Sequence, residues 1–390
     1  MKVGRVRGCV GGLAVLAVLA VLAVLAVLGA APAYAQYTVG AGIDYLGYAF
    51  DDGLGAEAAQ LLMIPVGIRF AATEALTFDA GGAWAEGRIE RQGSQLELSG
   101  PVDMSVRAAY QATPWGLVTL GVNIPTGNSQ HDGEEAIVAS LLSTDLLGFR
   151  EATWGRGLAV TSSLAVARSV GSFGLGLAGA YSVRGKFKPS ADQTELEYQP
   201  GNEARIRLGV DRNFGNSTLT LGTTFSNYTD DQADGRNLFK AGSRLRFDAT
   251  YAWRLGAGVW TLYAADLLRQ HGDLTLEVLD SQGASQGFTD VETPSHNLAI
   301  VGVMGAVGIG GGFVFRPHLD FKLQSREDAA GSDEGSGWLV AAGGDLPMRV
   351  FGGYDFFPKA RVILGSITAS TGEGIDVFGM EFTGTVRASF

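Results

Sequence analysis

Cysteine is almost missing from this chain of 390 residues, because the one cysteine is Cys9. An internal disulfide is therefore excluded. Histidine is also scarce, with four residues scattered along the sequence, so we expect neither a bound metal nor a cofactor. The 29 basic residues are outnumbered by 40 acidic ones. Because nucleic-acid-binding proteins carry a basic surface, this chain does not predict a nucleic-acid partner.

The first 35 residues are expected to be a secretory signal peptide. Lys2, Arg5 and Arg7 precede an apolar run of Ala, Val and Leu over 13–28, and Ala33-Tyr34-Ala35 has the small-x-small pattern of a cleavage site. The alternative is an uncleaved anchor, because the run approaches the ~18 residues that a spanning helix needs. Cleavage leaves 26 basic against 40 acidic residues, a net charge of about −14 over about 355 residues.

The rest of the chain has no second long apolar run, but short alternating segments fill it. In 376–390, Phe378 and Phe382 fall on one parity, and Glu381 and Thr383 on the other. Successive strand side chains point to opposite faces, so this segment has one apolar and one polar face. A barrel that spans a membrane through strands shows this alternation, with only moderate overall hydropathy.

Sixteen such segments can be counted, at 37–45, 62–70, 76–88, 101–112, 117–125, 157–167, 173–183, 203–212, 218–227, 243–253, 259–268, 296–307, 313–323, 338–350, 359–369 and 376–390. Short connections rich in Gly, Pro or Asn alternate with long polar ones, as in barrels with periplasmic turns and outer loops. We therefore predict an all-β fold, a closed antiparallel transmembrane β-barrel of about 16 strands over 36–390, because open sheet edges are too costly in lipid. Fourteen strands is the fallback if 343–355 is irregular, and a soluble secreted sandwich or propeller is the alternative.

The final strand, which ends on the aromatic Phe390, looks like the closing strand of a Gram-negative outer-membrane barrel. The resemblance implies location in the cell outer membrane, contact with the lipid bilayer and lipopolysaccharide, and use of Phe390 as a signal for the outer-membrane assembly machinery. The segment 121–127, Gly-Val-Asn-Ile-Pro-Thr-Gly, resembles a strand end of porin-like barrels of the FadL-like hydrocarbon-uptake type. The Asn-Pro-Ala plug motif of that group is not found here.

Charged residues on the polar parity are expected to face the barrel lumen, because an arginine on the lipid side costs about 2–4 kcal/mol. They are the candidate selectivity residues: Asp103, Arg107, Arg205, Arg207, Arg244, Arg246, Asp248, Arg316, His318, Asp320 and Lys322. Two interpretations stay open. The charges can pair with one another in a filled lumen, or they can set the field inside a water-filled pore.

The connection 126–156 is expected to contain an amphipathic helix at about 133–147. Asp132 and Glu135 form a variant capping box, and apolar residues follow at helical spacing. The helix can narrow the barrel mouth or lie against the rim. The candidate constriction residues are Glu134, Glu135, Ile137, Leu141 and Leu142.

The expected function is a channel or transporter that lets small solutes cross the outer membrane passively through the lumen. A non-conducting barrel that serves as a structural or surface-interaction protein is the alternative. An outer-membrane hydrolase comes third, because His318 and Asp320 share a face but no nucleophile of matching parity accompanies them. The sequence therefore predicts no enzyme and no catalytic residue.

Overall fold

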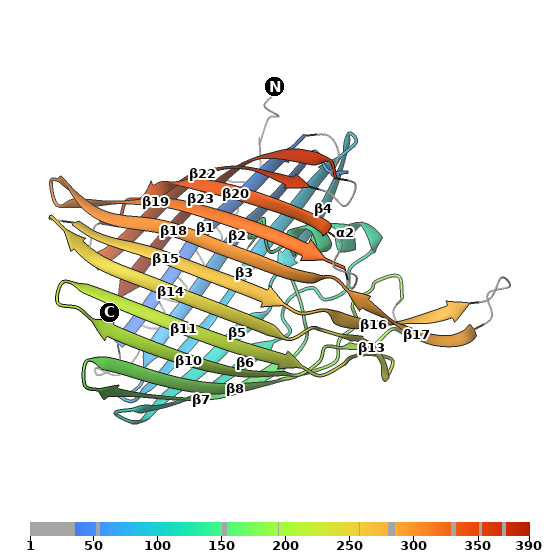
Figure 1. Ribbon diagram of the computed structural model, residues 1–390, viewed down its shortest axis with the longest axis horizontal. Helices are drawn as coiled ribbons and strands as arrows, with labels where there is room; N and C mark the ends of the chain where they lie inside the picture. Colours follow the sequence, from blue (N-terminus) through green and yellow to red (C-terminus); the bar gives the residue numbers. More distant parts are fainter. Residues whose placement is uncertain are drawn as a thin grey trace.

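The computed structural model describes residues 36–51, 55–149, 154–193, 195–256, 258–279, 285–328, 333–350, 353–368 and 372–390. Within these ranges, sixteen antiparallel strands close into one barrel (Figure 1). The predicted fold class is confirmed, with sixteen strands and not fourteen. The predicted signal peptide, 1–35, lies outside the described residues. No helix in the described ranges is long and apolar enough to cross a bilayer.

The barrel strands are β1 Gln36–Phe50, β2 Ala58–Ala71, β3 Leu76–Arg91, β5 Met104–Thr113, β6 Gly116–Ile124, β7 Ala159–Val170, β8 Phe173–Arg184, β10 Glu203–Asn213, β11 Ser217–Tyr228, β14 Arg244–Leu255, β15 Gly258–Arg269, β18 Ser295–Gly310, β19 Phe313–Glu327, β20 Asp333–Asp345, β22 Tyr354–Thr368 and β23 Gly374–Ser389. Two short strands extend this sheet, β4 Ser94–Pro101 beside β3 and β21 Met348–Arg349 beside β22.

The first and last strands close the barrel. β1 and β23 pair in register from Thr38 opposite Ser389 to Phe50 opposite Val377. The backbones of Tyr37 and Phe390 exchange hydrogen bonds in both directions, at 3.1 and 2.9 Å. Every barrel strand therefore has two neighbours, and no sheet edge is left in the plane of the membrane.

The alternation expected from the sequence sets which side chains face out. On β23, Phe378, Met380 and Phe382 are exposed, whereas Glu381 and Thr383 are buried inside. Exposed apolar side chains recur on the outer face of the other barrel strands. A closed antiparallel barrel with an apolar outer surface is the architecture of an outer-membrane barrel.

The two ends of the barrel differ (Figure 1). At the end called here the turn end, consecutive strands join through tight turns, and Gly171 and Gly215 sit in them at φ +60° and +72°. These left-handed conformations favour glycine. At the opposite end, the loop end, long connections build a second sheet of β9 Tyr198–Gln199, β12 Asp231–Ala233, β13 Arg236–Lys240, β16 Gly272–Leu279 and β17 Ser285–Thr293.

This second sheet was not predicted, because its strands lie in connections that the sequence marks as long and polar. β16 and β17 form a hairpin that projects beyond the barrel (Figure 1). The connection between β6 and β7 behaves differently. It contains the helix α2 Gly133–Leu142 and turns toward the barrel axis, where it forms the candidate site.

Candidate functional site

The connection between β6 and β7 is closed at its base by backbone contacts. A Cβ atom on Gly127 would lie 1.7 Å from the carbonyl oxygen of Trp154, so only glycine fits at that position. Asp103 accepts hydrogen bonds from the backbone N–H groups of Gly127 and Arg156, at 3.0 and 2.7 Å. The segment 121–127 therefore ends in an anchor for this connection.

The helix α2 begins where the sequence predicts it. The Asp132 carboxylate accepts from the Glu135 backbone N–H at 2.9 Å, and the Glu135 carboxylate accepts from the Asp132 N–H at 3.2 Å. This capping box satisfies two N–H groups that the first turn leaves open. Val138 and Leu142 are buried against β2, β3 and β4, whereas Ile137 is exposed. The helix therefore covers the inner wall with one face.

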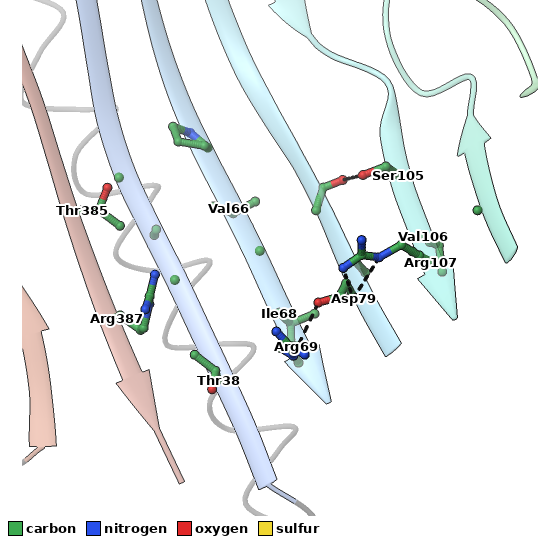
Figure 2. A pocket seen from close by; sticks show the side chains of 18 of the residues that line it. Thr38, Val66, Ile68, Arg69, Asp79, Ser105, Val106, Arg107, Thr385 and Arg387 are labelled. Atoms are coloured by element: carbon green, nitrogen blue, oxygen red, sulfur yellow. Dashed lines mark hydrogen bonds and ion pairs between the residues drawn. The ribbon is translucent and has the colours of Figure 1, made fainter. Parts of the chain in front are cut away.

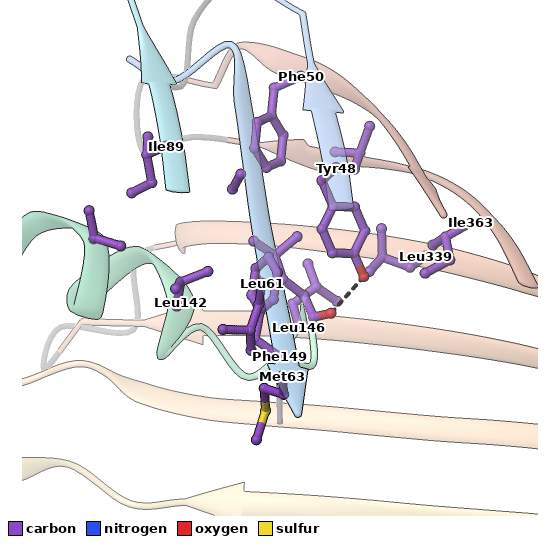
Figure 3. Close-up of a cluster of buried hydrophobic side chains, with 14 of the residues drawn as sticks. Tyr48, Phe50, Leu61, Met63, Ile89, Leu142, Leu146, Phe149, Leu339 and Ile363 are labelled. Carbon is purple, nitrogen blue, oxygen red and sulfur yellow. Dashed lines mark hydrogen bonds between the residues drawn. The ribbon is translucent and has the colours of Figure 1, made fainter. Parts of the chain in front are cut away.

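The residues after the helix enter the lumen instead of continuing the helix to 147. We call 143–149 the inserted segment. Its apolar members Leu146, Leu147 and Phe149 are buried, as is Trp154 beyond it. They belong to a cluster with side chains that point inward from the wall (Figure 3), namely Tyr48, Phe50, Leu61, Met63, Leu339 and Ile363. Burial of each such side chain stabilises the fold by about 1.5–3 kcal/mol, and this gain ends the helix early.

Polar contacts fix the inserted segment in place. The Tyr48 hydroxyl donates to the Leu147 carbonyl at 2.6 Å (Figure 3), and the Lys322 ammonium donates to the Leu146 carbonyl at 3.3 Å. The Asp145 carboxylate lies 3.4 Å from Nε2 of His296 on β18. Hydrogen bonds from Tyr48 on β1 and Lys322 on β19, together with the approach of Asp145 to His296 on β18, place the segment inside the lumen.

A charge network supports the segment from the wall of β19, β22 and β23. Arg361 donates to Asp320 and to Glu381, and Lys359 donates to Glu381 at 2.9 Å. Both carboxylates are buried. A buried carboxylate is tolerated only when cations or N–H groups compensate it, so this part of the lumen is filled by mutual pairing.

The wall of β10, β11 and β14 carries a second group of charges. Arg205 binds Glu203 at 2.6 Å, and Arg207 reaches both oxygens of Asp248 at 2.8 and 2.7 Å. Glu203 also accepts from Arg184 at 3.0 Å. Arg205 and Arg207 are about half exposed, so their pairing adds little stability.

Two large cavities lie in the lumen, and the second of them is lined in part by the inserted segment. The turn-end cavity measures about 920 Å³ and is lined by Thr38, Arg69, Asp79, Arg107 and Arg387, among others (Figure 2). The loop-end cavity measures about 690 Å³, and Asp145, Arg184, Glu203 and Arg205 contribute to its lining. Ser105, Asn123 and Thr161, on β5, β6 and β7, line both cavities. The two cavities therefore share this stretch of wall.

The structure pairs several predicted lumen residues with partners that the sequence did not suggest. Arg107 binds Asp79 on β3 at 2.8 Å, and not Asp103. Arg316 and His318 both approach Asp345, at 3.5 and 2.9 Å. Asp320 and Lys322 belong to the wall under the inserted segment, and Arg244 and Arg246 lie on β14 near Asp248.

None of the five expected constriction residues belongs to the inserted segment, because all five lie on α2. Glu134 and Ile137 are exposed on α2, Glu135 serves the capping box, and Leu141 and Leu142 pack toward the wall. The narrowing is formed by 143–149 because the apolar side chains of that stretch find a matching inner surface. The sequence contains an indication of this covered inner surface. Leu61-Leu62-Met63-Ile64 is apolar on both parities, which indicates a strand that is covered on both faces.

The four histidines lie in different parts of the structure and do not share one site. Within the described residues, none of the four is hydrogen-bonded to a serine or threonine hydroxyl. His131, in the loop before α2, lies 3.7 Å from Glu135. Burial lowers the pKa of His131, and the Glu135 carboxylate acts in the opposite direction. This geometry does not assemble the nucleophile, base and carboxylate that acyl transfer uses.

Comparisons with known proteins give structural neighbours only. No protein-family model and no curated protein matches the chain. The chain is similar to Pseudomonas aeruginosa OccK5 (OpdH), with 11% identity, a TM-score of 0.49, and 91% of this chain and 98% of that chain covered. It is similar to Acinetobacter baumannii OccAB4, with 9% identity, a TM-score of 0.47, and coverage of 91% and 98%. It is also similar to a loop L8 deletion mutant of Vibrio cholerae OmpT, with 12% identity, a TM-score of 0.44, and coverage of 91% and 99%. The assignment of the fold rests on the strand pairing described above.

Proposed function

We propose that this barrel is a channel for the passive passage of small polar solutes across the outer membrane. The observation that carries the proposal is the pair of cavities that share Ser105, Asn123 and Thr161, the second of them bounded by the inserted segment. A solute that follows β5, β6 and β7 passes the narrowing along hydroxyl and amide groups. Such groups exchange hydrogen bonds with a hydrated solute without holding it tightly.

The inserted segment sets the width of the path in this proposal. The connection that carries it is anchored at its base by Asp103, and the segment itself is held in the lumen by Tyr48 and Lys322. The polar lining of the shared wall favours hydrophilic cargo, so we do not extend the proposal to the hydrophobic molecules of FadL-like barrels. We also propose that the protein has no enzymatic role and that Phe390, exposed at the turn end, acts as the assembly signal.

Conductance of the purified protein in planar lipid bilayers tests the proposal. We expect discrete current steps in potassium chloride, each of them small because the inserted segment leaves a narrow path. Liposomes that contain the protein should also swell in small polar solutes and not in large oligosaccharides. A correctly folded barrel that gives neither current steps nor swelling would favour a structural or surface-interaction barrel instead.

A further inference from the structure

On the inner wall of β14 and β15, positive charges outnumber negative ones, because the carboxylate there, Asp248, already binds Arg207 on β10 through both oxygens. Arg244 and Arg269 are opposite each other in register, and Arg246 follows Arg244 on the same face. In the described part of the chain, none of the three lies within ion-pair distance of a carboxylate, in contrast to Arg205 and Arg207 on β10. We call Arg244, Arg246 and Arg269 the arginine strip.

The arginine strip also has hydrogen-bond donors that the described residues do not satisfy. The Nε atoms of Arg244 and Arg269 are buried without an acceptor among the described residues. The guanidinium carbon of Arg244 lies over the ring of Tyr228, 5.4 Å from the ring centroid. The carboxylate nearest in sequence, Asp248, lies on the same face two residues after Arg246, but both of its oxygens already accept from Arg207. Asp266 on β15 is opposite Phe247 and Ala299, which belong to the outer face. Asp248 therefore offsets the charge of Arg246 only in part, and neither carboxylate forms an ion pair with Arg244 or Arg269 in the described part of the chain.

The inserted segment brings one carboxylate to the border of this strip. Asp145 lies 3.4 Å from His296, and His296 is opposite Arg269 in register. The Asp145 side chain is 40% exposed and lines the loop-end cavity. The Asp145 carboxylate therefore lies at the edge of the arginine strip.

We propose that the arginine strip is a binding site for small hydroxylated organic anions, such as sugar acids or sugar phosphates, and that Asp145 is a tethered competitor at its edge. A guanidinium group offers paired N–H donors that match a carboxylate or a phosphate. Ser143, Thr144 and Ser182 line the adjoining cavity and supply partners for the hydroxyl groups of the solute. This inference rests on the proposed channel function and names its substrate class.

Reversal potentials across a potassium chloride gradient test the charge preference. We expect the wild-type channel to prefer anions. The double variant Arg246→Gln with Arg269→Gln should lower the anion-to-cation permeability ratio by roughly fourfold or more. The reason is that one unit charge about 5 Å from an ion in water changes the local concentration of that ion by about this factor. Arg212→Gln is the matched control, because this arginine stacks on Phe173 and Phe214 at the turn end and points away from the lumen. It should leave the ratio unchanged.

Solute entry tests the binding chemistry. In liposome swelling, gluconate and glucose 6-phosphate should each enter faster than glucose, Asp145→Asn should increase that advantage, and the double arginine variant should abolish it. The faster of the two anions identifies carboxylate or phosphate as the preferred group. Current steps with cation preference, or equal entry of glucose and both anions, would overturn the inference and leave the channel standing. Absence of current would instead contradict the channel itself.

Discussion

Excision of residues 133–153 and their replacement by a short glycine linker should raise the single-channel conductance several-fold. The base of this connection is suited to the cut, because Gly127 is packed on Trp154 and Gly155 is packed on Asn128. The excision removes the inserted segment and the side chains that fill the lumen beside Leu61. The two cavities then merge over a wider cross-section. Planar-bilayer recordings of the refolded variant measure the effect.

The control for this excision removes a similar part of the loop end that does not touch the lumen. The parts of the β16–β17 hairpin at 276–279 and 285–289 project beyond the barrel (Figure 1). Replacement of 276–289 by a short turn should leave the conductance at the wild-type value. If excision of 133–153 leaves the conductance unchanged while the barrel folds, the inserted segment does not set the width of the path.

Replacement of Arg361 by Met should destabilise the barrel by about 3–5 kcal/mol, because it leaves two buried carboxylates without their shared cation. Arg361 donates to both Asp320 and Glu381, and both of these side chains are buried. The free energy of unfolding can be measured by guanidinium chloride titration in detergent with tryptophan fluorescence. Heat-modifiable electrophoretic mobility provides an independent measure of the folded fraction.

Two further variants separate loss of this network from a general effect of removing an arginine. Arg316→Met removes a more exposed partner of Asp345 and should cost less than about 1 kcal/mol. Adding Asp320→Asn to Arg361→Met removes the carboxylate that has lost its cation and should recover part of the lost stability, whereas Glu381 keeps its hydrogen bond from Lys359. Equal losses in the free energy of unfolding for Arg361→Met and Arg316→Met would show that the buried network stabilises the barrel no more than an exposed ion pair does.

The barrel follows from the sequence because its signal is local. Each strand shows its two faces through alternate residues, such as Phe382 and Glu381, and the turn end shows itself through glycines such as Gly171. Neither inference needs knowledge of distant residues. The capping box at the start of α2 is equally local, because Asp132 and Glu135 are three positions apart.

The site follows less well, because its contacts join distant parts of the chain. Arg361 meets Asp320 across a gap of 41 residues, and Lys322 meets Leu146 across 176. The sequence indicates that these side chains face inward, but it does not say which strands lie beside the inserted segment. The strands of the second sheet were missed for a related reason. Their pairing partners, such as Tyr198 and Ala233, come from different loops.

The account depends most on a path that runs along β5, β6 and β7 beside the inserted segment. Cys9 precedes the described residues, so a cysteine placed in the barrel is the only thiol there. Thr161→Cys puts it on the wall shared by both cavities, and Val160→Cys puts it on the outer face one residue away. Single-channel conductance is recorded before and after a bulky, membrane-impermeant thiol reagent is added. The account predicts that the reagent blocks the current of Thr161→Cys and not that of Val160→Cys; an unblocked current in Thr161→Cys after complete modification would contradict it.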